Sequence, residues 1–242
     1  DLHLSLRRQR QMCIRDRYTM TDFNSLRLNM VNNQIKPFAV TNSAILDAFA
    51  TTPRENFGQF IQESAIYTDN ILYLNQKKKF ESRYYLPAAV FAKMIQIAGI
   101  RKHERVLDIG CLTGYTSAIL SKICETVDGL EKHEELVDIA KENIKKLGIE
   151  NIKVHQGNLK DGLKKRELFD AVFINGSVDL VPQPINDQVK DGGRVVTIKR
   201  DGQIGYMVVL KKAGNYMNQI NHFEITVPYI SKDFIRKSEF AF

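Results

Sequence analysis

Short apolar runs alternate with amphipathic helical patterns through the second half of the chain, and this alternation constrains the fold more than any other feature. The apolar runs predict strands at residues 106–109, 126–130, 152–155, 169–174 and 194–199, and helical patterns lie at 113–124, 133–147 and 181–189. Neighbouring parallel strands need a long crossover connection, usually a helix. The alternation therefore predicts an α/β fold in which helices cover both faces of a mostly parallel, twisted sheet.

The C-terminal part of the chain breaks this rhythm. Two strand patterns, near residues 204–210 and 223–229, follow each other without an obvious helix between them. Strands joined directly in this way pair antiparallel, so we expect an antiparallel edge on the sheet. Residues 100–242 then make up the alternating core, and residues 20–99 a helical segment that packs on it, in one domain overall.

Three helical patterns precede residue 100. The first ends at Pro37, and the second follows Asn42, a good N-cap, and stops at Pro53. Pro87 suits the first turn of the third helix, and Gly99 suits its C-terminal end. These residues predict three N-terminal helices before the first core strand.

Composition narrows the class of protein. The chain has 242 residues, of which 43% are hydrophobic, enough for a packed core. No apolar run approaches the roughly 20 residues that a membrane helix needs. Cys13, Cys111 and Cys124 lie far apart and form no C-x-x-C pair. This spacing argues against a metal site and a disulfide framework and predicts a cytoplasmic location.

The formal net charge of +7 is concentrated in part at the start of the chain. Residues 1–19, DLHLSLRRQRQMCIRDRYT, are rich in arginine and lack apolar periodicity. They could be a basic arm for nucleic acid, but we favour a non-native or disordered extension, with Met20 as the natural start. Lysine-rich stretches at residues 77–79, 145–146 and 164–166 have no accompanying aromatic pattern. We therefore expect solvated surface there, and no nucleic-acid partner.

The stretch VLDIGCLTGY, residues 106–115, predicts a strand, a turn with two glycines and the start of a helix. In an open α/β sheet, ligands bind at the carboxyl ends of the strands, so this first unit marks the expected site. The dinucleotide pattern G-x-G-x-x-G fails because Leu112 stands between Gly110 and Gly114, and the P-loop pattern fails too. A nucleotide-type ligand without phosphate remains.

Two carboxylates flank that turn and indicate which ligand it would hold. Glu131 ends the second predicted strand and could accept both ribose hydroxyls of an adenosine, and Asp108 ends the first and could face an amino group. S-adenosylmethionine has a ribose, an ammonium group and no phosphate, so it suits this set. The alternative is a tight structural turn with both carboxylates solvated. The ordered motifs that follow favour cofactor binding.

Beyond these motifs, the sequence resembles the protein-L-isoaspartate O-methyltransferase family from Met20 to Phe242. The resemblance lies in MVNNQIKPFAVTNSAILDAFATTPRENF, LPAAVFAKMIQIAGIRKHERVLDIG and FDAVFINGSVDLVPQPINDQVKDGGRVV. It implies a Rossmann-like methyltransferase fold that uses S-adenosylmethionine. The implied reaction is methylation of isoaspartyl carboxylates in damaged proteins or peptides, which begins their repair. A monomer is expected.

The resemblance also implies a set of site residues. The expected cofactor-binding residues are Asp108, Gly110, Cys111, Gly114, Glu131, Asn158, Leu159 and Asn175. Asn158 stands where the family carries an acid, and residues 175–177 are expected to form a turn on the cofactor side. In the substrate-side loop before Pro87, residues 83–86 lie over the family's T-I-S-Q segment. Tyr85 would supply the hydroxyl of that serine as the catalytic-site residue.

Leu112 is the clearest departure from the family turn, which has glycine at this position. We expect its side chain to turn toward the sheet or the helix after Pro87 and to pack in the core. Transfer of a methyl group to an ionised carboxylate depends mainly on positioning, which suits a chain with no evident nucleophile–base pair. Two alternatives stay open: a methyltransferase of the same fold with another acceptor, and a non-catalytic cofactor-binding or interaction protein.

Overall fold

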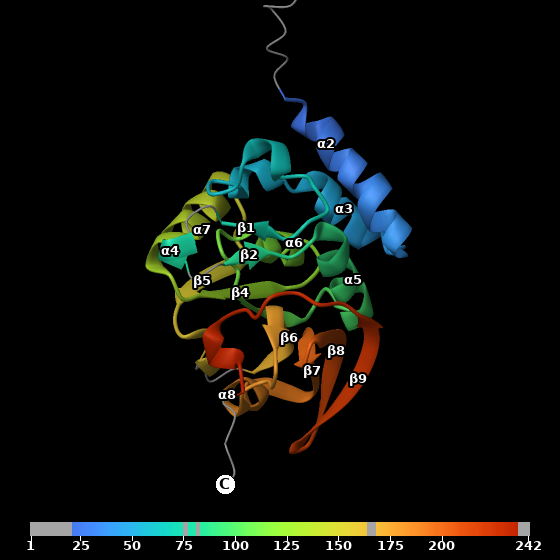
Figure 1. Cartoon of the computed structure of the whole chain (residues 1–242), viewed down its shortest axis with the longest axis vertical. Coiled ribbons are helices and arrows are strands. Elements are labelled where there is room, and N and C mark those ends of the chain that lie inside the picture. The colour runs from blue at the N-terminus through green and yellow to red at the C-terminus, as the bar shows by residue number, and fades with distance from the viewer. Residues whose placement is uncertain (1–20, 75–76, 81–82, 164–167, 237–242) are drawn as a thin grey trace, which may run out of the picture.

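A computed structural model describes residues 21–74, 77–80, 83–163 and 168–236 of the chain (Figure 1). The expectation of a disordered extension at residues 1–19 therefore lies outside the described residues, as does the basic stretch 164–166. Within the described ranges, no helix combines the length and the apolar composition needed to cross a membrane.

The N-terminal helices form where the sequence predicts them. Helix α2 (Phe23–Met30) continues through a π-helical turn (Val31–Ile35) and a 3₁₀ turn (Lys36–Phe38), and Ala39, with φ 56°, ends the run. Helix α3 (Ser43–Thr51) begins after Asn42, whose side chain accepts a hydrogen bond from the backbone of Ile45. Helix α5 (Ala88–Ala98) runs from Pro87 to Gly99, which has φ 62°. The three predicted helices are confirmed.

A short two-stranded hairpin lies between α3 and α5. Strand β1 (Leu72–Tyr73) pairs antiparallel with β2 (Tyr84–Tyr85), and the short helix α4 (Lys77–Phe80) lies between them. Two 3₁₀ turns, η3 (Arg54–Phe57) and η4 (Glu63–Ala65), precede this hairpin. The hairpin matters for the site because it places the residues just before α5 over the carboxyl end of the main sheet.

The main sheet has seven strands in the order β5-β4-β3-β6-β7-β8-β9. Five strands run parallel: β3 (Arg105–Ile109), β4 (Thr126–Glu131), β5 (Ile152–Gln156), β6 (Phe169–Val178) and β7 (Val189–Asp201). Two strands add an antiparallel edge: β8 (Ile204–Ala213) and β9 (Tyr216–Glu224). The predicted mostly parallel sheet with an antiparallel edge is confirmed.

Helices cover both faces of this sheet, and the alternation of side chains along each strand explains how. On β3, Val106 belongs to the core cluster that includes residues of α5, whereas Leu107 belongs to the cluster that includes Ile185. Successive side chains of a strand point to opposite faces, so the two clusters are the two sides of the sheet. The helices that follow the core strands are α6 (Tyr115–Leu120), α7 (Glu134–Lys146) and α8 (Gln183–Asp187).

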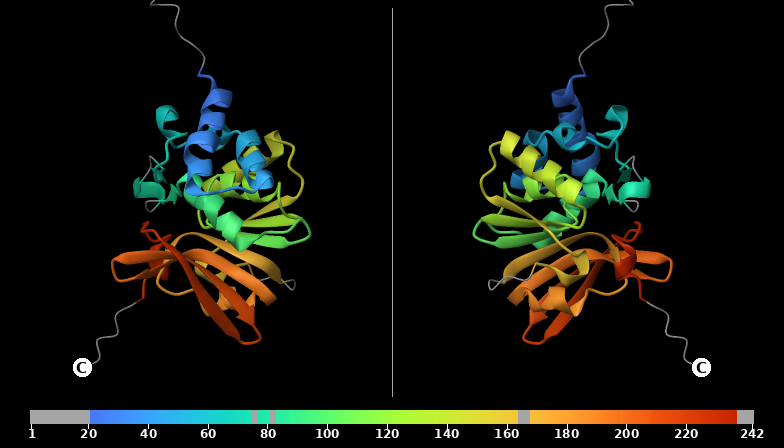
Figure 2. Two further views of the ribbon diagram at one scale, coloured as in Figure 1. Left: turned by 90° about the vertical axis from the view of Figure 1, so that its right-hand side faces the viewer. Right: turned by 90° about the vertical axis from the view of Figure 1, so that its left-hand side faces the viewer.

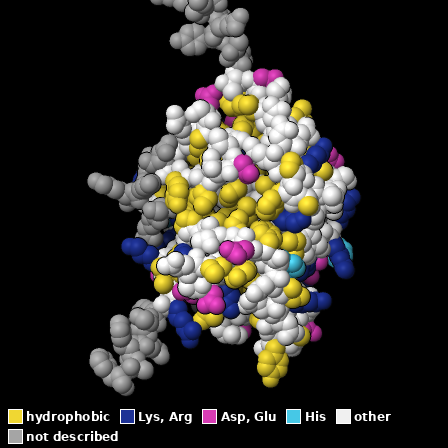
Figure 3. Space-filling view, turned by 45° about the vertical axis from the view of Figure 1, so that its right-hand side comes forward, with side chains coloured by type: hydrophobic (Ala, Val, Ile, Leu, Met, Phe, Trp, Pro, Cys, Tyr) yellow, Lys and Arg dark blue, Asp and Glu magenta, His cyan; other side chains and the backbone are white. Residues whose placement is uncertain are grey.

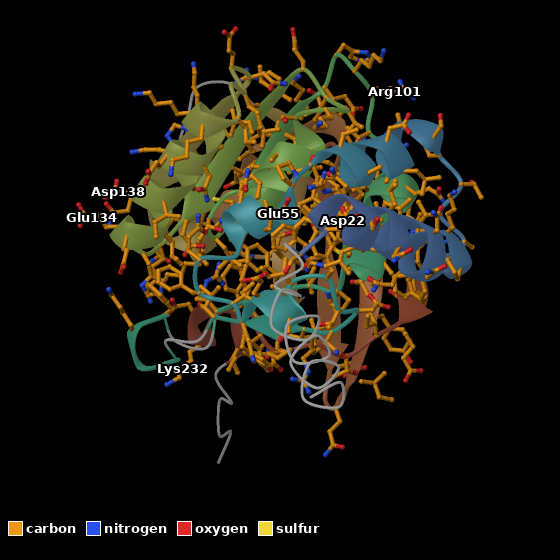
Figure 4. All side chains as sticks on the ribbon, turned by 90° about the horizontal axis from the view of Figure 1, so that it is seen from above. Asp22, Glu55, Arg101, Glu134, Asp138 and Lys232 are labelled. Atoms are coloured by element: carbon orange, nitrogen blue, oxygen red, sulfur yellow. The ribbon has the colours of Figure 1, made fainter. Side chains whose placement is uncertain are left out.

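Figure 2 shows that the N-terminal helices gather at one end of the molecule and the C-terminal strands at the other. Within the N-terminal end, Glu55 of η3 joins two elements: it accepts hydrogen bonds from Arg27 of α2, at 2.7 Å, and from the hydroxyl of Tyr67. Burial, together with the hydrogen bond to Glu55, raises the pKa of Tyr67 to about 12. Seen from this end, Glu55 and Asp22 both project onto the middle of the view, whereas Glu134 and Asp138 project from the outer edge of α7 (Figure 4).

Several element bounds differ from the sequence expectation, including those of α6 (115–120 against 113–124) and β7 (189–201 against 194–199). Residues 175–177 do not form a turn but continue β6, which accommodates them through an irregularity in its pairing with β7. The last strand is 216–224 rather than 223–229, because a turn at Gly214 (φ 59°) closes the β8–β9 hairpin earlier. β9 is an edge strand with mostly exposed side chains, so it lacks the apolar pattern that would reveal it. The helix expected at 181–189 is only α8, and Val189 already begins β7.

One face of the described surface carries a broad apolar region. Figure 3 shows hydrophobic side chains gathered in the middle of one face, between the N-terminal helices and the C-terminal strands. Two lysines of the basic stretches form surface ion pairs: Lys79 pairs with Glu135, and Lys146 pairs with Glu142.

Candidate cofactor site

The order of the strands fixes where a ligand would bind. From β3 the chain moves outward to β4 and β5, then returns to the other side of β3 to form β6. At such a switch the connections leave in opposite directions, and a crevice opens at the carboxyl ends of the two central strands. A ligand crevice is therefore expected between the ends of β3 and β6, where Asp108 and Asn175 of the sequence-predicted site lie.

Asp108, near the end of β3, connects the two sides of this crevice. Its Oδ1 accepts a hydrogen bond from Asn175 Nδ2 on β6 at 2.6 Å, and its Oδ2 accepts from the hydroxyls of Thr116 and Ser117 on α6 at 2.7 and 2.6 Å. The side chain is fully buried, and this burial raises the pKa of Asp108 despite the three donors. Asp108 therefore holds the start of α6 and the end of β6 on β3.

One side-chain atom of Asn175 has no hydrogen-bond partner among the described residues. Its Nδ2 donates to Asp108, but its Oδ1 is buried and has no hydrogen-bond partner among the described residues. A buried acceptor without a partner costs free energy, and such atoms are found where a ligand or water completes the site. Asn175 thus presents an acceptor to an N–H or O–H group entering the crevice.

The turn after β3 is built from residues with left-handed backbone. Gly110 and Gly114 have φ of 83° and 98°, and Leu112 between them has φ of 54°. Leu112 is only 1% exposed and belongs to the core cluster that contains the side chains of α5, so the prediction that it packs in the core is confirmed. Cys111 is also fully buried, which raises the pKa of its thiol well above the ordinary value.

Glu131, the last residue of β4, is completely buried beside this turn. Its Oε2 accepts hydrogen bonds from the backbone N–H of Leu112 at 3.1 Å and from Arg83 Nη2 at 2.8 Å. Its Oε1 accepts from the backbone N–H groups of Lys132 and His133 at 2.8 and 3.4 Å. The carboxylate lies where the sequence predicts it, at the cofactor turn, but it is paired with an arginine.

Arg83 and Ile230 are the residues that sequence reasoning missed. Arg83 precedes β2 and is 3% exposed, and its Nη1 donates to the carbonyl of Ile230 at 2.8 Å. A Cβ placed on Gly110 would lie 2.8 Å from both Arg83 Nη2 and Ile230 Cδ1. These two side chains therefore fill the space beside the glycine. The signal for Arg83 was a lone charge directly before the apolar run YYLP, and Ile230 had no sequence signal.

Tyr85 lies close to the turn but faces inward. Its hydroxyl shares a hydrogen bond with Thr113 Oγ1 and also accepts from the Thr113 backbone N–H at 3.3 Å. The side chain is 4% exposed, and burial raises the pKa of its phenol. The structure brings Tyr85 to the turn, and its catalytic role stays a prediction.

The two residues expected after β5 have different environments. Asn158 is exposed, and its side chain accepts from the backbone of Lys160 at 3.3 Å, which begins a 3₁₀ turn (Leu159–Asp161). Leu159 is buried at 2% exposure. Both lie beside the end of β4, because β5 pairs in parallel with β4 up to Glu131 and Gln156. No group of three or more His, Cys, Asp or Glu in the described ranges is placed to hold a metal ion.

A parallel sheet whose strand order switches beside a glycine turn, with acids at or near the ends of two adjacent strands, is typical of Rossmann-like methyltransferases. The family model for protein-L-isoaspartate(D-aspartate) O-methyltransferase matches residues 25–232. The chain belongs to this family.

Relatives and solved structures agree with the family assignment. A protein-L-isoaspartate O-methyltransferase of Roseiflexus castenholzii is 30% identical over 80% of this chain and 86% of its own length, and one of Shewanella sediminis is 33% identical over 70% and 68%. A solved protein-L-isoaspartate O-methyltransferase is 27% identical with a TM-score of 0.75, over 85% of this chain and 65% of that chain. A structure from Plasmodium falciparum, in complex with S-adenosyl-L-homocysteine, has a TM-score of 0.70 at 17% identity, over 85% and 97%. The last likeness shows the fold alone.

Proposed function

We propose that this chain transfers a methyl group from S-adenosylmethionine to the free carboxylate of isoaspartyl residues in proteins or peptides. The observation that carries the proposal is the buried set of Asp108, Asn175 and Glu131 at the switch crevice of a chain that belongs to this methyltransferase family. These side chains offer acceptors at the ends of three adjacent strands, β4, β3 and β6.

The residue types suit S-adenosylmethionine. Glu131 would accept the ribose hydroxyls, and the free Oδ1 of Asn175 would accept a further N–H or O–H donor. Asn158, exposed at the end of β5, would accept from the adenine amino group without adding charge. The space is less suitable in this conformation, because Arg83 lies against Glu131 and Gly110.

Methyl transfer to a carboxylate requires little from the protein beyond the positioning of the two reactants. The cofactor supplies a methyl group already activated on a sulfonium, and an ionised carboxylate needs no general base to attack it. The chain's own contribution would be to orient the two reactants and exclude water, which can supply several kcal/mol of rate enhancement. Tyr85 is the proposed hydroxyl on the substrate side, where its turn toward the acceptor would require it to leave Thr113.

The test is transfer of a labelled methyl group from S-adenosylmethionine to an isoaspartyl peptide, with the normal aspartyl peptide as control. We expect label in the isoaspartyl peptide alone, released by base as a methyl ester is. Cofactor binding with label in neither peptide would refute the isoaspartyl proposal.

A second candidate, methylation of another acceptor by the same fold, is favoured by one observation. The family's serine position carries Tyr85, whose hydroxyl is engaged with Thr113 inside the protein. An acceptor other than an isoaspartyl carboxylate would fit a site reshaped in this way. A screen of protein extracts treated with labelled cofactor would separate the two candidates, because only the second predicts labelled products when the isoaspartyl peptide fails.

We also propose that the protein works as a cytoplasmic monomer without a nucleic-acid partner. The ion pairs of Lys79 and Lys146 with neighbouring glutamates support the absence of a nucleic-acid partner. Light scattering after gel filtration would test whether the protein is a monomer. A gel-shift assay with DNA and RNA would test whether it binds nucleic acid. The shared core cluster of the N-terminal helices and the sheet supports one domain, which predicts a single unfolding transition.

A further inference from the structure

We propose that Arg83 and Ile230 occupy part of the space that the cofactor would fill. The cofactor then enters only when the two segments that carry these residues, 83–84 and 228–230, move away together. We call these residues the closing segments. The inference rests on the cofactor site of the proposed function, and it adds an internal competitor for that site.

The hydrogen-bonding capacity of Glu131 limits what the ribose can do. A carboxylate offers about four lone-pair positions. In Glu131 these face two backbone N–H groups on one oxygen and, on the other, the backbone N–H of Leu112 and Nη2 of Arg83. Ribose hydroxyls can bind this carboxylate only if a donor leaves. The backbone donors belong to the two turns that shape the site, so Arg83 is the donor that can be displaced.

The closing segments also block the site sterically, independently of charge. Ile230 is 1% exposed, and its side chain lies 2.8 Å from the position of a Cβ on Gly110. A Cβ on Gly176 of β6 would likewise lie 2.8 Å from Ile230 Cβ and from the hydroxyl of Tyr84. The lack of a side chain at these glycines leaves room beside β3 and β6, and the closing segments fill it.

The two closing segments are tied to each other, so they should move as a unit. Arg83 Nη1 donates to the carbonyl of Ile230 at 2.8 Å, and the hydroxyl of Tyr84 donates to the carbonyl of Pro228. Residues 228–230 in turn hold β6 by two backbone hydrogen bonds: Ser177 N–H donates to Pro228 at 3.0 Å and Ile230 N–H donates to Ser177 at 3.1 Å. The segment after β9 can be followed across β6 in Figure 1.

The consequence for affinity follows from population arithmetic. If the ligand binds only the open form, its apparent dissociation constant equals the intrinsic one divided by the open fraction. Removing Arg83 leaves Glu131 buried without its cation, which is costly to the free protein. Ligand hydroxyls can replace the missing donor, so the variant should gain more from binding than the native protein does.

The experiment is calorimetric titration of the full chain with S-adenosylhomocysteine, comparing wild type with Arg83→Met and Ile230→Ala. The matched controls are Arg194→Met, which breaks the partly buried Arg194–Glu104 pair at the opposite end of the sheet, and Ile185→Ala in the same core cluster as Ile230. We expect Arg83→Met to bind about ten-fold tighter or more, and Ile230→Ala several-fold tighter. Both controls should bind as wild type does.

A second measurement, on the wild type, covers the case in which Arg83→Met does not fold. Hydrogen exchange with saturating S-adenosylhomocysteine should accelerate at the amides of Ser177 and Ile230, whose hydrogen bonds hold the closing segment to β6. An ordinary pocket would slow exchange there instead. Slowed exchange, or variants that bind no tighter than wild type, would overturn the inference.

The outcomes for the two proposals can be told apart. Tighter binding by the variants without methyl transfer to the isoaspartyl peptide would refute the proposed function and support the closing segments. Transfer by the wild type with equal affinity in all variants would refute the closing segments alone. If neither the wild type nor the opened variants bind S-adenosylhomocysteine, both proposals fail.

Discussion

Replacing Leu112 by glycine and by alanine should reveal the backbone strain of the cofactor turn. Leu112 has φ of 54° and is 1% exposed, so it combines a left-handed backbone with a fully packed side chain. A left-handed conformation costs an ordinary residue about 1–2 kcal/mol. Truncation of a buried leucine to alanine costs about 2–5 kcal/mol. Leu112→Ala should lose the packing free energy while keeping the backbone strain.

Leu112→Gly loses the same packing but is released from the strain. The release of about 1–2 kcal/mol exceeds the 0.5–1 kcal/mol or so that glycine's greater chain freedom costs. We therefore expect Leu112→Gly to be less stable than wild type by about 2–4 kcal/mol, yet more stable than Leu112→Ala by roughly 0.5–1 kcal/mol. Affinity for S-adenosylhomocysteine should change little, because the side chain packs in the core.

Leu136 of α7 gives the control, since it is equally buried but helical. There, glycine should be less stable than alanine by about 1 kcal/mol, the reverse of the order at Leu112. Urea unfolding of the four variants and wild type measures both differences. If alanine is the more stable replacement at Leu112 as well, the turn is not strained there and the reasoning is wrong.

Three further predictions concern other parts of the chain. Ala39 is exposed and has φ of 56°, so Ala39→Gly should raise the free energy of unfolding by roughly 0.5–1 kcal/mol, which urea unfolding would detect. Burial acts to raise the pKa of Asp170 but is outweighed by its hydrogen bonds, including that from Lys190, so its pKa lies below 3.8. Lys190→Met should therefore destabilise by at most about 1 kcal/mol near neutral pH, and the difference should vanish as pH falls through that lowered pKa. Burial raises the pKa of Cys124 to about 12 and that of Cys111 well above its ordinary value, so a variant keeping only these two thiols should react with a disulfide reagent no faster than it unfolds.

The elements of the core could be predicted because their signals are local. The strand before α6 carries Val106, Leu107 and Ile109 within five residues. Asn42, Pro87 and Gly99 act on the backbone within one turn of themselves. β9 could not be found in this way. Most of its side chains face solvent, so its place is set by pairing with β8 rather than by its own pattern.

The residues of the candidate site likewise include some that the sequence predicts and some that it does not. Asp108 and Glu131 were predictable because each ends a recognisable strand, and the carboxyl ends of parallel strands meet at one edge of the sheet. Arg83 and Ile230 were not, because their roles arise from a contact between distant parts of the chain. A single sequence carries no local sign of the partner that a buried arginine will meet.

That distant contact also bears on how the protein is made. The hydrogen bond from Arg83 to Ile230 joins residues 147 positions apart. During synthesis, Arg83 leaves the ribosome long before its partner has been joined to the chain. We infer that the guanidinium stays hydrated until the last strands dock, so that the region around Glu131 is among the last parts of the nascent protein to be sealed from water.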